Sequence, residues 1–181
     1  MASKIKVDTL ETANGSGTIA LSNQLSGMTT ASLPTLTSAE MPAGSVLQMI
    51  SATQDGTSAV TSTSSSYVTT GLSKAITPRS TSSKIKIDAS FFADANSNGC
   101  NIYFQMKRGS TSLGGSTQDG NTGIALVSNT RLLMGMNISY LDSPSTTSAV
   151  TYELFMKVAG GTVVYKPDQI LSSLILTEIQ G

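Results

Sequence analysis

The sequence of 181 residues predicts an all-β fold, built as an antiparallel sandwich or a barrel. Apolar and polar residues alternate with a period of two in several segments, which is typical of strands that bury one face. Clusters of Gly, Pro, Asn, Asp and Ser separate these segments and favour turns. No long segment has the spacing of an amphipathic helix. About eight or nine strands spaced in this way indicate a sandwich or barrel.

Four segments alternate most regularly, and each predicts a half-buried strand. They are residues 84–93, 101–109, 131–142 and 151–159. The residues expected on their buried faces are Ile85, Ile87, Ala89 and Phe91; Ile102, Phe104 and Met106; Leu132, Met134, Met136, Ile138 and Tyr140; and Tyr152, Leu154, Met156 and Val158. The methionines are expected to fill the core, since a flexible thioether adapts to irregular gaps.

Weaker patterns predict five further strands. They lie at 45–52, 67–78, 122–128, 161–165 and 172–180. The Ser- and Thr-rich segment 57–68 predicts either a loop or a flat edge strand, because it has few large apolar residues.

The N-terminal segment predicts a separate β-hairpin. Residues 1–24 contain two short alternating runs around "NGSG" at 14–17, whose residues tolerate the positive φ of a tight reversal. Residues 25–44 predict an extended linker, and residues 45–181 the sandwich. An isolated hairpin is marginally stable in water. It is therefore expected to pack on its own sandwich, on a sister chain or on another protein. The residues that would be buried there are Ile5, Val7, Leu10, Ile19 and Leu21.

The composition argues against several classes of protein. Eleven basic residues balance eleven acidic ones, so no electrostatic surface for nucleic acid is expected. The only basic pair, Lys107 and Arg108, is interpreted as a solvated strand end. No run is long enough for a membrane span, and the N-terminus lacks the apolar core of a signal peptide. Only 12% of residues are charged, a composition common in extracellular and virion β-proteins.

An enzyme is not expected, and neither a cofactor nor a metal ion is predicted. The chain contains no histidine, which removes the commonest general base and metal ligand. Its one cysteine, Cys100, is expected to be a small buried hydrophobe. Most of the eleven acidic residues are expected in turns or on solvent-facing strand positions. A carboxylate pair that cleaves a polysaccharide is the least favoured alternative. The loop "DANSNG" at 94–99 lacks the final glutamate of a calcium loop and predicts a turn.

Several segments resemble small virion surface proteins of tailed phages, of the tail-fibre, head-appendage or decoration type. The resemblance lies in "PTLTSAEMPAGSVLQMISA" (34–52), "LSKAITPRSTSSKIKI" (72–87), "YLDSP" (140–144), "TYELFMK" (151–157) and "SSLILTEIQ" (172–180). It implies a jelly-roll sandwich similar to C1q/TNF-like trimeric heads. It also implies a homotrimer on the virion surface, made in the host cytoplasm, whose N-terminal hairpin anchors it to capsid or tail proteins.

Three aromatic residues are candidates for the interface of such a trimer. Phe91 and Phe92 are adjacent, so one should enter the core and the other should lie outside it. Tyr103 and Phe155 each lie opposite the apolar face of their strand. The interface prediction is therefore Phe92, Tyr103 and Phe155.

Two virion functions remain open from the sequence. One is a fibre or appendage head that binds the host surface, with a host-surface glycan as a further partner. The other is a capsid decoration protein that clamps capsid subunits. Because histidine is absent, assembly is expected to change little between about pH 6 and 8.

Overall fold

The computed structural model places one compact unit at Thr37–Gly181. The residues it describes are 37, 40–55, 59–95, 99–115, 120–126, 131–165 and 170–181. The predicted hairpin at 1–24, and most of the predicted linker at 25–44, lie outside the described residues.

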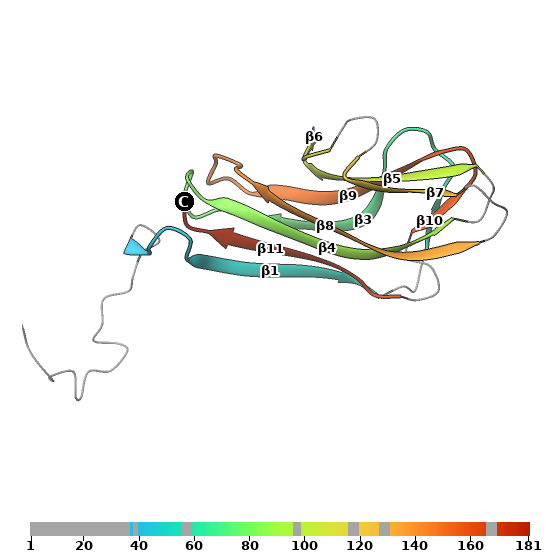
Figure 1. The fold of residues 1–181 in the computed structure, drawn as a ribbon. Helices are drawn as coiled ribbons and strands as arrows, with labels where there is room; N and C mark the ends of the chain where they lie inside the picture. Colours follow the sequence, from blue (N-terminus) through green and yellow to red (C-terminus); the bar gives the residue numbers. More distant parts are fainter. Residues whose placement is uncertain are drawn as a thin grey trace, which may run out of the picture. The chain divides into compact units, whose positions relative to one another are not determined.

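The described residues form two antiparallel sheets and contain no helix longer than a single turn. Their strands are β1 (Val46–Gln54), β2 (Val60–Ser62), β3 (Val68–Ile76), β4 (Lys84–Ala95), β5 (Cys100–Arg108), β6 (Thr111–Ser112), β7 (Thr122–Leu126), β8 (Leu132–Asp142), β9 (Val150–Ala159), β10 (Val163–Tyr165) and β11 (Ser172–Ile179). Sheet A contains β1, β11, β4, β8, β10 and β2, and sheet B contains β3, β9, β5, β6 and β7. Figure 1 shows them as two stacked layers.

The strands pair in a nested order. In sheet A, β1 pairs with β11 and β4 pairs with β8; in sheet B, β3 pairs with β9 and β5 pairs with β7. In chain order the pairs are β1–β11, β3–β9, β4–β8 and β5–β7, and each pair lies between the two strands of the pair before it. Strands β11 and β4 join the pairs of sheet A, and β9 and β5 join those of sheet B. This is the double Greek key of a jelly roll, so the predicted fold class is confirmed.

The short strands extend this eight-stranded frame. Strand β10 pairs with the C-terminal end of β4, and β2 pairs with β10 at the edge of sheet A. Residues 60–62 of the Ser- and Thr-rich segment therefore form an edge strand, one of its two predicted forms. Strand β6 pairs with only two residues of β5 and has no alternating pattern that could predict it.

The core lies between the inner faces of the two sheets. The buried faces predicted for β4, β5 and β9 are confirmed, since all eleven of those residues are at most 2% exposed. Three buried rings meet at its centre: Phe91 lies 4.7 Å from Phe104 and 6.1 Å from Tyr165, measured between ring centres. Cys100 is also fully buried, as predicted. The aromatic cluster joins β4 and β10 of one sheet to β5 of the other.

The prediction that methionines fill the core is wrong at two edge positions. Met49 on β1 is 64% exposed and Met134 on β8 is 41% exposed. Met134 belongs to the inward-facing set of β8, but this part of the strand lies at the sheet edge and is not covered. Strand β8 pairs only with β4 within the described residues.

Tyr165 provides a test of core packing at high pH. Burial raises the pKa of Tyr165 to about 12, and its hydroxyl donates a hydrogen bond to Gln54 Oε1 at 3.0 Å. In the unfolded chain the phenol ionises near pH 10. Between these values the unfolded state has lost more protons, so stability falls as pH rises from about 10 to 12.

We expect Tyr165→Phe to weaken this alkaline loss of stability. The contribution of one phenol reaches about 1.4 kcal/mol for each pH unit. Urea unfolding of both proteins at a series of pH values between 9 and 12 measures the difference. Other groups titrate equally in both proteins and cancel in the comparison. Parallel stability curves would contradict a buried, protonated Tyr165.

Candidate functional site

The three predicted aromatic residues that the structure describes lie outside the core, on two different faces. Phe92 lies on the outer face of sheet A, whereas Tyr103 and Phe155 lie together on the outer face of sheet B. The five apolar residues of the predicted hairpin, Ile5 to Leu21, lie outside the described residues.

Phe92 packs over a glycine on the neighbouring strand. Its register partner on β8 is Gly135, and a Cβ atom at that position would lie 3.2 Å from the Phe92 ring. The glycine gives the ring room to lie flat against the sheet, so Phe92 is half-buried rather than projecting into solvent.

Tyr103 and Phe155 belong to a cluster in which aromatic rings alternate with lysines. The Nζ atom of Lys107 lies 4.4 Å from the ring centre of Phe155 and 5.3 Å from that of Tyr67. The Nζ atom of Lys157 lies 4.8 Å from the ring centre of Tyr67 and 5.2 Å from that of Tyr103. These five half-buried side chains, Phe155, Lys107, Tyr67, Lys157 and Tyr103, are called the lysine–aromatic cluster below.

Strand register brings this cluster together. Lys157 on β9 is the direct partner of Tyr103 on β5, and Lys107 lies diagonally across from Phe155 on the same strand pair. Direct and diagonal neighbours on one face are within reach of long side chains. Tyr67 precedes β3, yet its hydroxyl lies next to Gly120 beside β5. Its ring therefore lies across the outer face of the sheet.

The interpretation of Lys107 and Arg108 as a solvated strand end is wrong. Lys107 is half-buried over two rings, and Arg108 pairs with Asp142, with Nη1 2.6 Å from Oδ2. The two adjacent residues point to opposite faces of β5 and find different partners. The alternation of β5 and β9 could have indicated Lys107 and Lys157 as neighbours of the predicted aromatics. Tyr67 begins the predicted strand 67–78, but nothing in the sequence indicated that it meets Lys107 and Lys157 on other strands.

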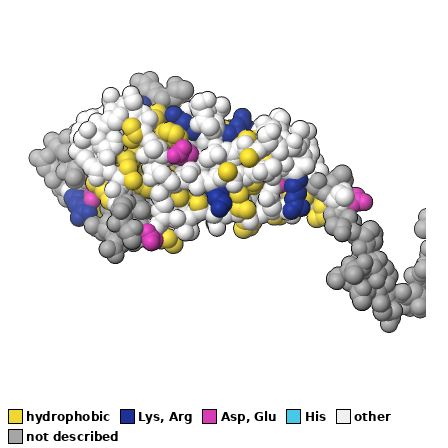
Figure 2. Space-filling view, turned by 180° about the vertical axis from the view of Figure 1, so that it is seen from behind, with side chains coloured by type: hydrophobic (Ala, Val, Ile, Leu, Met, Phe, Trp, Pro, Cys, Tyr) yellow, Lys and Arg dark blue, Asp and Glu magenta, His cyan; other side chains and the backbone are white. Residues whose placement is uncertain are grey.

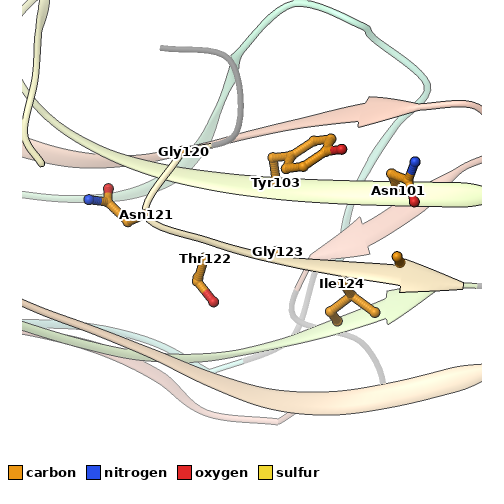
Figure 3. A pocket seen from close by; sticks show the side chains of 8 residues that line it. Asn101, Tyr103, Gly120, Asn121, Thr122, Gly123 and Ile124 are labelled. Atoms are coloured by element: carbon orange, nitrogen blue, oxygen red, sulfur yellow. The ribbon is translucent and has the colours of Figure 1, made fainter. Parts of the chain in front are cut away.

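A pocket of about 390 Å³, whose lining residues are drawn in Figure 3, shares Tyr103 with the cluster. Asn101 and Tyr103 of β5 line it together with residues 120–125, which lead into and along β7. Gly123 is the register partner of Tyr103, and a Cβ atom there would lie 3.1 Å from the ring. The absence of a side chain at Gly123 lets the Tyr103 ring lie close against β7, and Tyr103 belongs to both the pocket and the cluster.

Hydrogen bonds from Gln105 fix the segment that borders the pocket. Its buried side-chain amide donates to the carbonyl oxygens of Leu113 and Gly114 and to Asn121 Oδ1, over 3.0 to 3.3 Å. Asn121 in turn accepts from the backbone N–H of Met106 and donates to the carbonyl of Leu113. Because these amides satisfy buried backbone groups, they hold Leu113, Gly114 and Asn121 against β5.

Three acidic residues in the described part of the chain, Asp94, Asp142 and Glu178, are buried. Asp94 accepts from Arg131, Asp142 accepts from Arg108 and Tyr152, and Glu178 accepts from Gln48, Ser83 and the backbone N–H of Arg79. Burial and the Asp142 carboxylate both raise the pKa of Tyr152, which keeps it a donor. These carboxylates are engaged in structural hydrogen bonds.

Within the described ranges, no group of three His, Cys, Asp or Glu side chains is arranged to hold a metal ion. In that same part of the chain, none of the helices has the length and hydropathy of a membrane span.

No protein-family model and no curated protein matches this sequence. Three solved structures of infectious bursal disease virus are similar to it. The Gx strain is 16% identical with a TM-score of 0.40, covering 74% of this chain and 32% of that chain. The Gt strain is 15% identical with a TM-score of 0.41, covering 76% and 34%. The VP2 subviral particle is 15% identical with a TM-score of 0.40, covering 76% and 34%. The chain thus spans about a third of the length of these viral chains.

We expect Gly120→Ala to be far more destabilising than Gly99→Ala. The two glycines have nearly the same φ, +70° and +71°. At Gly99 a Cβ atom would meet nothing within 4 Å, so the substitution costs only the left-handed backbone, about 1 kcal/mol. At Gly120 it would lie 2.3 Å from the Phe104 carbonyl oxygen and 2.7 Å from the Tyr67 hydroxyl.

This overpacking lowers the free energy of unfolding of Gly120→Ala by roughly a further 1–3 kcal/mol. Urea unfolding followed by circular dichroism measures both free energies of unfolding. Equal losses at the two positions would show that Tyr67 and residue 120 are not packed together.

Proposed function

We propose that this protein is a non-enzymatic structural protein of a phage virion surface, a homotrimer anchored by its N-terminal segment with the sandwich exposed. The observation that carries the proposal is the nested strand order of the jelly roll. That order is the head fold implied by the resemblance of residues 34–52, 72–87 and 172–180 to phage surface proteins. A surface rich in uncharged polar groups, seen in Figure 2, suits a particle exterior.

The outer face of sheet A supports self-association. Met49, Thr177, Lys86 and Leu141 form one row of register partners across β1, β11, β4 and β8. The two ends of the row are apolar and exposed, 64% for Met49 and 49% for Leu141. Further exposed apolar residues lie on this face of the same two strands, namely Val46 and Leu133.

Two different apolar edges on one sheet favour a head-to-tail contact. The β1 edge of one copy would cover the β8 edge of the next, and such heterologous contacts close into a ring when the rotation between copies permits. A trimer is the smallest ring that this contact can form. The contact would also cover the unpaired edge of β8, which otherwise invites uncontrolled strand pairing.

We expect Met49→Glu and Leu141→Glu each to dissociate the trimer, because each places a charge in an apolar contact. An equal mixture of the two variants should form a one-to-one dimer, since each chain keeps one intact edge. Light scattering of the full chain measures the masses. Ala75→Glu, at an exposed position of β3 on the other sheet, should remain a trimer.

A monomeric wild-type protein would contradict the homotrimer. Variants that stay trimeric would exclude these edges and assign trimer formation to another part of the chain. Two dissociated variants that form no dimer on mixing would exclude the head-to-tail arrangement.

A capsid decoration protein is the second candidate function. In that function the exposed apolar residues of sheet A would contact capsid subunits. The fibre or appendage head differs from it in position on the particle.

Antibody labelling of intact virions, imaged by electron microscopy, distinguishes the two. Label at the tail or at one vertex is expected for a fibre or appendage head, and label over the capsid facets for a decoration protein. A particle of the same phage lacking this protein is the control. If no part of the particle is labelled, the virion proposal is wrong.

A further inference from the structure

The lysine–aromatic cluster carries positive charge that the protein does not neutralise by ion pairing. Within the described part of the chain, neither Lys107 nor Lys157 forms a salt bridge with a carboxylate. Glu153 is the register partner of Lys107 on the same face, but its carboxylate accepts a hydrogen bond from Thr69 on the opposite side. The rings hold the two ammonium groups through their negative faces. An anion would therefore be attracted to this face.

The adjoining pocket has the size and the groups of a small-molecule site. Its volume of about 390 Å³ falls in the range of ligand pockets, which combine an aromatic wall with a few polar groups. Tyr103 supplies the wall, with its ring set by Lys157 on one side and by the absent side chain of Gly123 on the other. The Asn101 side chain has no hydrogen-bond partner within the described residues, so both ends of its amide remain available.

We propose that the pocket and the lysine–aromatic cluster together bind an acidic saccharide, a sugar that carries a carboxylate or sulfate group. The C–H face of the sugar ring packs on Tyr103. The Asn101 amide exchanges hydrogen bonds with the sugar hydroxyls, and the Lys157 ammonium pairs with the acidic group. This binding function goes beyond the structural role proposed above. It uses the opposite sheet from the trimer edges, so Tyr103 and Phe155 are assigned to the ligand face rather than to the trimer interface predicted from the sequence.

A saccharide fits this face better than single-stranded nucleic acid does. Nucleic acid needs a line of cations that follows its phosphates and open ring faces on which bases stack. The cluster has two lysines, and Tyr103 is its single ring that lines the pocket, so one sugar ring can pack there but a row of stacked bases cannot. An acidic saccharide needs only one cation for its acidic group and one aromatic ring for its sugar ring, and this face provides both.

Calorimetric titration of the full chain tests the proposal with trigalacturonic acid, its methyl ester, a 6-sulfated galactose trisaccharide and a ten-residue oligothymidylate. Binding of the carboxylated or the sulfated sugar, and not of the uncharged ester, is expected. Its affinity should fall as salt is added. Binding of the ester as tightly as the acid, stronger binding of the oligothymidylate, or no binding of either acidic sugar would overturn the proposal.

Substitutions that change the affinity for the saccharide test where it binds. Lys157→Met keeps the length of the side chain and removes its charge, so affinity should fall about tenfold, the usual size of one charge-assisted contact. Lys84→Met, at an exposed position on sheet A, is the matched control and should bind normally. Asn101→Asp places a negative charge in the pocket without changing its size, and it should abolish binding even if Lys157→Met fails to fold.

Unchanged affinity in both folded site variants would exclude this face. Because these substitutions lie on sheet B, they should leave the trimer mass and the position on the virion unaltered. A failure of saccharide binding is therefore distinguishable from a failure of the virion proposal.

Discussion

The register of strand β4 with its neighbours determines the arrangement of most of the molecule. Its twelve residues pair with β8 along one edge and with β11 and β10 along the other. A shift of one residue in any of these pairings would turn every side chain of the shifted strand to the opposite face. The correct register places Phe91 at the centre of the core and leaves Phe92 outside over Gly135. The register of β4 therefore decides both which of its side chains fill the core and which lie on the surface.

The same constraint builds the candidate site on the other sheet. The inner positions of β5 and β9 fill the core, and the outer positions are left to carry Tyr103, Lys107, Phe155 and Lys157. Their spacing is set by the backbone pairing of β5 with β9. The side chains of Gln105 and Asn121 then hold the segment that borders the pocket. A rigid strand pair thus positions the proposed binding groups more accurately than a loop would.

Alternation in the sequence predicted the strands well because it depends only on neighbouring residues. It identified β4, β5, β8 and β9 and the outward position of Tyr103 and Phe155. It could not predict contacts between distant parts of the chain. Glu178 is a clear example, since it accepts hydrogen bonds from Gln48, 130 positions earlier, and from Arg79, 99 positions earlier. Tyr67 was missed for a similar reason, because its neighbours Lys107 and Lys157 become known only once three strands are aligned.

The nested order of the strands has a consequence for synthesis on the ribosome. Strand β1 emerges before the other strands of the sandwich, but its partner β11 is translated after all of them. The apolar side of β1 and the inner face of β4 therefore remain partly uncovered until almost the whole sandwich has been made. Folding that depends on such distant pairs is slow and exposes strand edges to other nascent chains. A low charge content gives little repulsion between those chains, so the correct closing of β11 competes directly with aggregation during translation.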